Sequence, residues 1–144
     1  MNKNSIYLLF GLVLTIIGCG KMDTNGTLDG NWQMTEWIDN STKEVVKDKN
    51  AQLFYTIKLE LLQMQDKSRE SVETMPYLAY FDHRGDSLIL GKVFKKMNNT
   101  DTLVTFSDVQ KLGVAPDGKF FIEQLTDEHM VLRNNINTLK FRKY

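Results

Sequence analysis

The pattern that most constrains the fold is a regular alternation of side chains between Ala51 and Leu61. Apolar or aromatic residues occupy the odd positions, and polar residues occupy most of the even ones. Successive side chains point to opposite faces of a β-strand, whereas a helix would scatter the same residues around its surface. The stretch is therefore predicted to be a strand whose odd positions from Leu53 to Leu61, Tyr55 and Ile57 among them, point inward.

Similar short runs recur along the chain, and polar turn signals such as Asn134-Asn135 separate them. Such short links favour antiparallel pairing of neighbours in sequence order. One link differs, because Ser107 offers a helix N-cap and Gly113 offers a glycine stop, so it is predicted to be one short helix. The predicted strands cover 30–38, 51–61, 75–82, 86–94, 102–106, 119–125, 129–133 and 138–142.

A sheet of eight consecutive antiparallel strands has two free edges, and closing the sheet on itself removes both. The sequence therefore predicts an all-β fold, a small eight-stranded antiparallel up-and-down β-barrel with one short helix. Residues 28–144 are expected to form this barrel, since their number suits one domain with a single core. A barrel of eight strands is just wide enough either to fill with side chains or to hold one small ligand.

Two segments of the chain resemble the lipocalins. Residues 28–32, LDGNW, are similar to the Gly-x-Trp opening of that family. The later run FFIEQLTDEHMVLRNNINTLKFRKY is similar to the closing strands of lipocalin-like lipoproteins of the Gram-negative envelope. The resemblance implies a lipocalin-like barrel over residues 28–144.

In lipocalins a tryptophan closes one end of the barrel, and an arginine of the final strand commonly packs over it. The resemblance gives these roles to Trp32 and Arg142. Arg142 alternates with Leu139 and Phe141, however, so the strand pattern alone predicts that it points away from the core unless a bulge intervenes. A solvated surface arginine and a lid over Trp32 both remain open.

The first predicted strand places Trp32, Met34, Glu36 and Ile38 on one face. If that face points inward, Glu36 lies among apolar groups, where it would need a partner, a water-filled cavity or the polar head of a ligand. The lining residues predicted for a small apolar or amphiphilic ligand are Trp32, Met34, Glu36, Tyr55 and Ile57. The alternative is a solid barrel without a ligand cavity, an interaction or structural module that docks on another envelope protein. The alternation does not distinguish the two, because a hollow and a solid barrel need the same pattern.

The N-terminal residues 1–18 have the layout of an export signal, with a polar start, an apolar stretch and the small residue Gly18. The apolar stretch is shorter than the about 20 residues that a membrane-spanning helix needs. The segment Ile16-Ile17-Gly18-Cys19 resembles the lipobox of bacterial lipoproteins, which implies that Cys19 is acylated after cleavage before it. The alternative is an ordinary secretory signal with an incidental cysteine.

Cys19 is the only cysteine of the chain, so it cannot form an intramolecular disulfide. Acylation would attach the protein to the lipid bilayer through Cys19, with 19–27 as the lipidated residue and its tether. Gly20 follows where some inner-membrane lipoproteins carry aspartate. The resemblance thus favours the outer membrane, on its periplasmic face or at the cell surface.

The remaining features exclude several functions. Lys and Arg total 18, as do Asp and Glu, so no excess of positive charge steers the chain to nucleic acid. His83 and His129 lack further ligands at metal spacing, so neither a metal site nor a cofactor is predicted. No nucleophile lies beside a readable base and no phosphate loop is present, so the chain is not predicted to be an enzyme.

Overall fold

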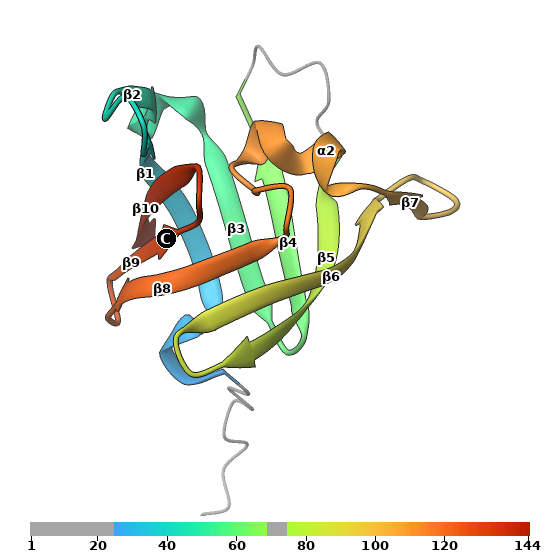
Figure 1. Ribbon diagram of the computed structural model, residues 1–144. Helices are drawn as coiled ribbons and strands as arrows, with labels where there is room; N and C mark the ends of the chain where they lie inside the picture. The colour runs from blue at the N-terminus through green and yellow to red at the C-terminus, as the bar shows by residue number, and fades with distance from the viewer. Residues whose placement is uncertain (1–24, 69–74) are drawn as a thin grey trace, which may run out of the picture.

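The computed structural model describes residues 25–68 and 75–144; the expected signal segment and Cys19 lie outside the described residues. Eight antiparallel strands follow one another around a barrel, and the last returns to pair with the first (Figure 1). The predicted all-β class and closed eight-stranded barrel are confirmed. The strands of this ring are β1 (Gly30–Asp39), β3 (Leu53–Lys58), β4 (Leu61–Asp66), β5 (Tyr77–Arg84), β6 (Ser87–Lys95), β8 (Lys119–Leu125), β9 (His129–Arg133) and β10 (Asn137–Lys143).

Among the described residues, two short strands lie outside the ring. β2 (Val45–Asp48) pairs with the end of β1, and β7 (Thr102–Val104) pairs with the end of β6. The ring continues from the other end of β6, where residues 87–89 pair with β8. The prediction that 102–106 forms a barrel strand is therefore wrong, because the ring passes from β6 to β8 and leaves β7 at the side.

The strand predicted from Ala51 to Leu61 is two strands in the structure. β3 ends at Lys58, and β4 begins at Leu61 and pairs back along it. The turn between them places Leu59 at φ 56, a left-handed conformation that glycine or asparagine usually takes, so composition gave no turn signal. The odd positions of β3, Leu53, Tyr55 and Ile57, are each 1% exposed and point inward as predicted. The prediction that Leu59 and Leu61 also point inward is wrong, because these residues are 48% and 37% exposed.

The predicted short helix is present as α2 (Phe106–Val109), followed by the 3-10 turn η4 (Gln110–Leu112). Its N-cap is Thr105 rather than Ser107. The Thr105 backbone N–H and hydroxyl both donate to the Asp108 carboxylate, at 2.8 and 2.9 Å. These hydrogen bonds hold the pKa of Asp108 below its usual range, the backbone one contributing most. Gly113 ends the segment at φ 96, as its glycine stop predicted.

The barrel has two different ends (Figure 1). At the tether end, where the described chain begins, the 3-10 turn η2 (Gly26–Leu28) places Leu28 under the core with no exposed surface. At the helix end, η4 and α2 cover the interior with Val109 and Leu112. The 3-10 turn η3 (Lys49–Ala51) connects β2 to β3 and contacts β1 and β2. The buried side chains form one apolar cluster, in which Trp32, Tyr55, Phe141, Leu28, Met34, Leu53, Ile57, Leu62, Met64, Leu88, Met130 and Leu132 are the largest fully buried members.

Candidate functional site

Four of the five predicted lining residues lie together inside the barrel. Trp32 and Met34 are 0% exposed, and Tyr55 and Ile57 are 1% exposed. Trp32 is the cross-strand partner of Tyr55, whose ring lies 4.8 Å from that of Phe141 between centroids. The pockets described below are lined by other residues. These four side chains therefore fill the core of the barrel.

The hydroxyl of Tyr55, one of the predicted lining residues, has a partner within the chain. It donates to the backbone carbonyl of Leu112 at 2.7 Å. Complete burial raises the pKa of Tyr55 above its ordinary value of 10.0, so the hydroxyl stays protonated and remains a donor. This bond fastens η4 to the inside of the barrel at the helix end.

Glu36 does not line the interior, and that prediction is wrong. A β-bulge between Met34 and Glu36 shifts the register of β1 against β10 and resets the alternation of side chains. Glu36 consequently points outward and forms an ion pair with Lys140, while Trp37 turns inward and is 8% exposed. Ile38, on the outward face, is also half-buried rather than in the core.

The bulge brings Trp37 into a polar network that the sequence did not reveal. Its indole N–H donates to the Asn137 side chain at 2.8 Å. The neighbouring Asn134 donates from its side-chain amide to the carbonyl of Gly113 at 2.9 Å. Both asparagines are buried at the helix end, where Asn134 ties the β9–β10 turn to the segment after η4 and Asn137 ties the start of β10 to β1. Asn134 belongs to a turn that the sequence predicts, whereas the hydrogen bond between Trp37 and Asn137 depends on the bulge in β1.

At the tether end a lysine, not an arginine, covers the tryptophan. Arg142 points outward, as the alternation predicted, and donates twice to the Gln33 side chain at 3.0 and 2.7 Å. The next residue, Lys143, places its ammonium 4.7 Å from the centroid of the Trp32 ring and donates to the Thr27 carbonyl. A Cβ on Gly30 would lie 2.5 Å from the Lys143 side chain, so the glycine of Gly-x-Trp makes room for this lysine.

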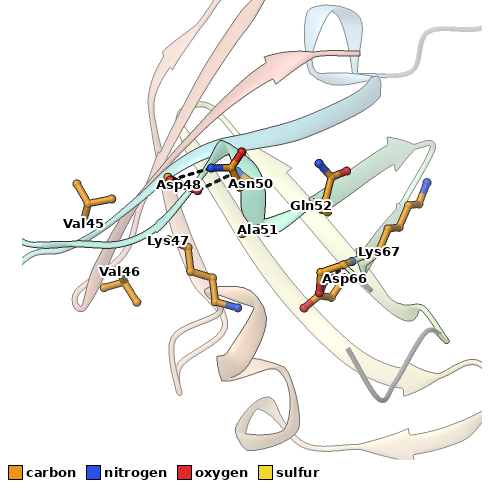
Figure 2. A pocket seen from close by; sticks show the side chains of 10 residues that line it. Val45, Val46, Lys47, Asp48, Asn50, Ala51, Gln52, Asp66 and Lys67 are labelled. Carbon is orange, nitrogen blue, oxygen red and sulfur yellow. Dashed lines mark hydrogen bonds between the residues drawn. The ribbon is translucent and has the colours of Figure 1, made fainter. Parts of the chain in front are cut away.

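The helix end carries an open pocket of about 910 Å³ between β2, η3 and the end of β4 (Figure 2). A second, smaller pocket of about 210 Å³ shares Lys47 and Asp66 with it and reaches the edge of η4 at Leu112. We call the two together the helix-end pocket. Its lining residues are Val45, Val46, Lys47, Asp48, Asn50, Ala51, Gln52, Asp66, Lys67 and Ser68, joined in the smaller part by Met75, Tyr77, Lys111 and Leu112.

The carboxylates of the helix-end pocket are engaged by the chain itself. Asp48 accepts from the backbone and side chain of Asn50, at 2.8 and 3.2 Å (Figure 2). Asp66 accepts from the backbone of Ser68 at 2.9 Å. These bonds shape the turns at η3 and after β4. The acidic groups therefore serve first to fix the rim of the pocket.

The lysines of the larger pocket lie over aromatic rings. The Lys47 ammonium is 5.7 Å from the centroid of the Trp37 ring, and that of Lys67 is 4.6 Å from the centroid of Phe54. The face of an aromatic ring attracts the lysine ammonium without accepting a hydrogen bond from each of its N–H groups, so these N–H donors can still bind another polar group. Exposed apolar surface lies beside them, because Val45 and Val46 are 53% and 51% exposed. The pocket thus pairs positive charge with apolar surface.

The histidines gave no ligand site. His83 makes a ring-nitrogen hydrogen bond with the carbonyl of Gly85 in the β5–β6 turn, and His129 pairs with Arg142 across β9 and β10. Within residues 25–68 and 75–144, no three His, Cys, Asp or Glu side chains are grouped so that they could hold a metal ion. The same described residues include no helix long and apolar enough to cross a membrane.

A small closed antiparallel barrel with a Gly-x-Trp entry and a covered far end defines the architecture. A family model described as a lipocalin-like domain matches residues 12–144. The chain therefore belongs to the lipocalin-like domain family. A comparison with curated proteins found no match.

Two solved structures share the fold. A lipocalin-like protein from Bacteroides uniformis is 16% identical, with a TM-score of 0.58 over 83% of this chain and 100% of that one. An uncharacterized protein from Bacteroides eggerthii is 19% identical, with a TM-score of 0.56 over 81% of this chain and 98% of that one. At these identities the similarity concerns the fold alone.

Proposed function

We propose that this protein is a lipid-anchored, lipocalin-like envelope protein that binds a small amphiphilic ligand in the helix-end pocket. The observation that carries the proposal is the open pocket of about 910 Å³ at the helix end. Its size lies within the range of about 300–1,000 Å³ that is usual for small-molecule sites. The barrel axis is a poorer site, because Trp32 and Tyr55 fill it and the Tyr55 hydroxyl is bound to Leu112.

The lining of the pocket favours an amphiphile over a purely apolar molecule. Val45 and Val46 offer apolar surface, and Lys47 and Lys67 offer N–H donors and positive charge. An anionic or polar head would meet the lysines, while an apolar tail would cover the valines. The function proposed for this pocket is binding rather than catalysis.

The anchor is supported by the sequence. The export-signal layout of residues 1–18 and the lipobox-like segment before Cys19 favour acylation of that cysteine. Two or more acyl chains would give a stable attachment, where one would be marginal. Gly20 after the cysteine favours the outer membrane. The ligand would then be bound at the surface of that membrane.

The binding proposal is tested with the anionic amphiphilic dye anilinonaphthalene sulfonate, titrated into the detergent-solubilised full chain. One dye per chain is expected to bind. Lys47→Glu should weaken binding at least tenfold, since it reverses a charge in the pocket, which corresponds to about 1.4 kcal/mol. The matched control is Lys92→Glu, an exposed lysine on β6 outside the pocket. Binding without a defined stoichiometry, or an equal effect of both variants, would contradict the proposal.

The filled interior favours a second function, that of a solid module docking on another envelope protein. In that case the dye does not bind stoichiometrically. The helix-end residues would instead cross-link to one protein in the intact envelope. A photoreactive amino acid at Val46, which is 51% exposed, distinguishes the two functions, because the ligand-binding proposal predicts no single protein adduct there.

A further inference from the structure

We propose that one wall of the barrel rests on the lipid bilayer to which the protein is anchored. The wall is formed by the strands β4 to β7 (Figure 1). The apolar side chains on its outer face are called the apolar wall patch. The inference goes beyond ligand binding but depends on the proposed acylation of Cys19. The members of the patch are Leu61, Leu78, Tyr80, Phe94 and Leu103.

The sheet register makes the apolar wall patch continuous. Leu61 is the cross-strand partner of Tyr80, and Phe94 is the partner of both Leu78 and Leu103. The rings of Tyr80 and Phe94 join the two rows, with their centroids 6.2 Å apart in an edge-on contact. With strands about 4.8 Å apart, the patch extends about 15 Å across four strands.

The patch is exposed where the outer face of an antiparallel barrel is expected to be polar. Leu103 is 62% exposed, Tyr80 51% and Leu61 37%. Single exposed apolar residues need no explanation, but a contiguous set marks an interaction surface. Covering it would remove apolar surface from water. The remaining question is which partner lies close enough to cover it.

The position of the chain entry identifies that partner. The side-chain amide of Asn25, the first described residue, donates to the carbonyl of Leu59 at 2.6 Å. Leu59 sits in the turn that leads directly to Leu61 and is itself 48% exposed. Five residues lie between Cys19 and Asn25, so the two Cα atoms are six steps of the chain apart and at most about 22 Å from each other. An acylated Cys19 therefore keeps the bilayer surface within reach of the patch.

The residue types also suit a bilayer surface. Tyrosine is enriched at membrane interfaces, where its ring meets the apolar region and its hydroxyl stays in water. The exposed Lys58 at the end of β3 is the cross-strand partner of Leu61, and the exposed Lys92 lies two residues before Phe94 on β6. The stems of both lysines can lie along apolar surface while their ammonium groups stay solvated. The patch is thus expected to sit at the headgroup level, with Tyr80 near its centre.

The experiment uses the full acylated chain with one added cysteine. Since Cys19 is the only native cysteine and is blocked by acylation, each new thiol can be labelled selectively. The variants are Leu61→Cys and Tyr80→Cys in the patch and Ile136→Cys as the control, because Ile136 is 40% exposed in the β9–β10 turn at the helix end. Each is labelled with bimane and reconstituted into vesicles of phosphatidylethanolamine and phosphatidylglycerol containing brominated lipid.

Patch labels are expected to shift to shorter emission wavelengths and to be quenched at least fivefold more strongly by brominated lipid than the label at Ile136. If the chain floats with the vesicles but all labels behave alike, docking of the wall is refuted and the anchor stands. If the chain does not float with the vesicles, the anchor proposal fails and the docking inference fails with it. A blue shift that appears without vesicles and grows with protein concentration would assign the patch to a second copy of the chain and overturn the inference.

Discussion

The Tyr55→Phe substitution examines the contact that closes the helix end. It removes one hydroxyl and keeps the ring, so the stacking of residue 55 on Phe141, with centroids 4.8 Å apart, should survive. What is lost is the 2.7 Å hydrogen bond to the carbonyl of Leu112, a residue that is only 3% exposed. The substitution therefore leaves a buried acceptor without its donor.

The expected cost follows from that unpaired carbonyl. Leaving a buried polar group unsatisfied destabilises a protein by about 1–3 kcal/mol. For a domain of this size, 1 kcal/mol corresponds to about 4 °C in Tm, so a fall of about 4–12 °C is expected. The assay is thermal and urea unfolding followed by circular dichroism, with an unchanged urea slope showing that the same surface unfolds.

The matched control is Tyr144→Phe, which removes the hydroxyl of a residue that is 77% exposed. Its effect should lie within about 0.5 kcal/mol of zero, as for most surface changes. The reasoning is refuted if the two variants lose the same stability. That result would mean that Leu112 reaches water in solution and that η4 does not seal the barrel.

Three further predictions follow from individual contacts. The pKa of Tyr55 in the folded protein is raised above 10.0, so its contribution to stability is complete below pH 10 and is lost as the pH rises beyond it. Urea unfolding should therefore give a smaller free energy of unfolding at pH 11 than at pH 8. This difference between the two pH values should be smaller in Tyr55→Phe. Gly30→Ala should lower the free energy of unfolding by about 1–3 kcal/mol, because φ is 144° and the new Cβ would meet Lys143 at 2.5 Å. The control Gly91→Ala, whose Cβ would meet no atom closer than 3.7 Å, should cost less than about 1 kcal/mol. Equal losses of stability for the two variants in urea unfolding would contradict this. Cys19→Ala should release the protein from membranes in a high-salt wash, and retention in the membrane fraction would argue against the lipid anchor.

The sequence predicted the barrel because its strongest signals are local. Alternation of apolar and polar residues follows directly from one buried face, and short polar links follow from antiparallel pairing. The closure between β1 and β10 could be inferred because a ring removes the free edges. The short helix before Gly113 was visible from its stop residue, although its cap is Thr105.

The errors have a common physical origin in backbone conformations that leave no compositional mark. Leu59 takes a left-handed turn without being glycine, so the alternation predicts one strand where the structure has β3 and β4. A bulge after Met34 moves Glu36 to the outside and Trp37 to the inside, which alternation alone cannot show. The same limit applies to the candidate site. The helix-end pocket is formed by η3 and the end of β4. These two segments lie close together because the turn at Leu59 folds β4 back along β3.

Binding of a small molecule at the helix end is the central claim, and native mass spectrometry of the full chain purified from its own envelope tests it most directly. The account predicts one small molecule per chain above the mass of the acylated protein, retained in wild type and lost in Lys47→Glu. A mass equal to that of the acylated chain alone in both proteins would contradict it.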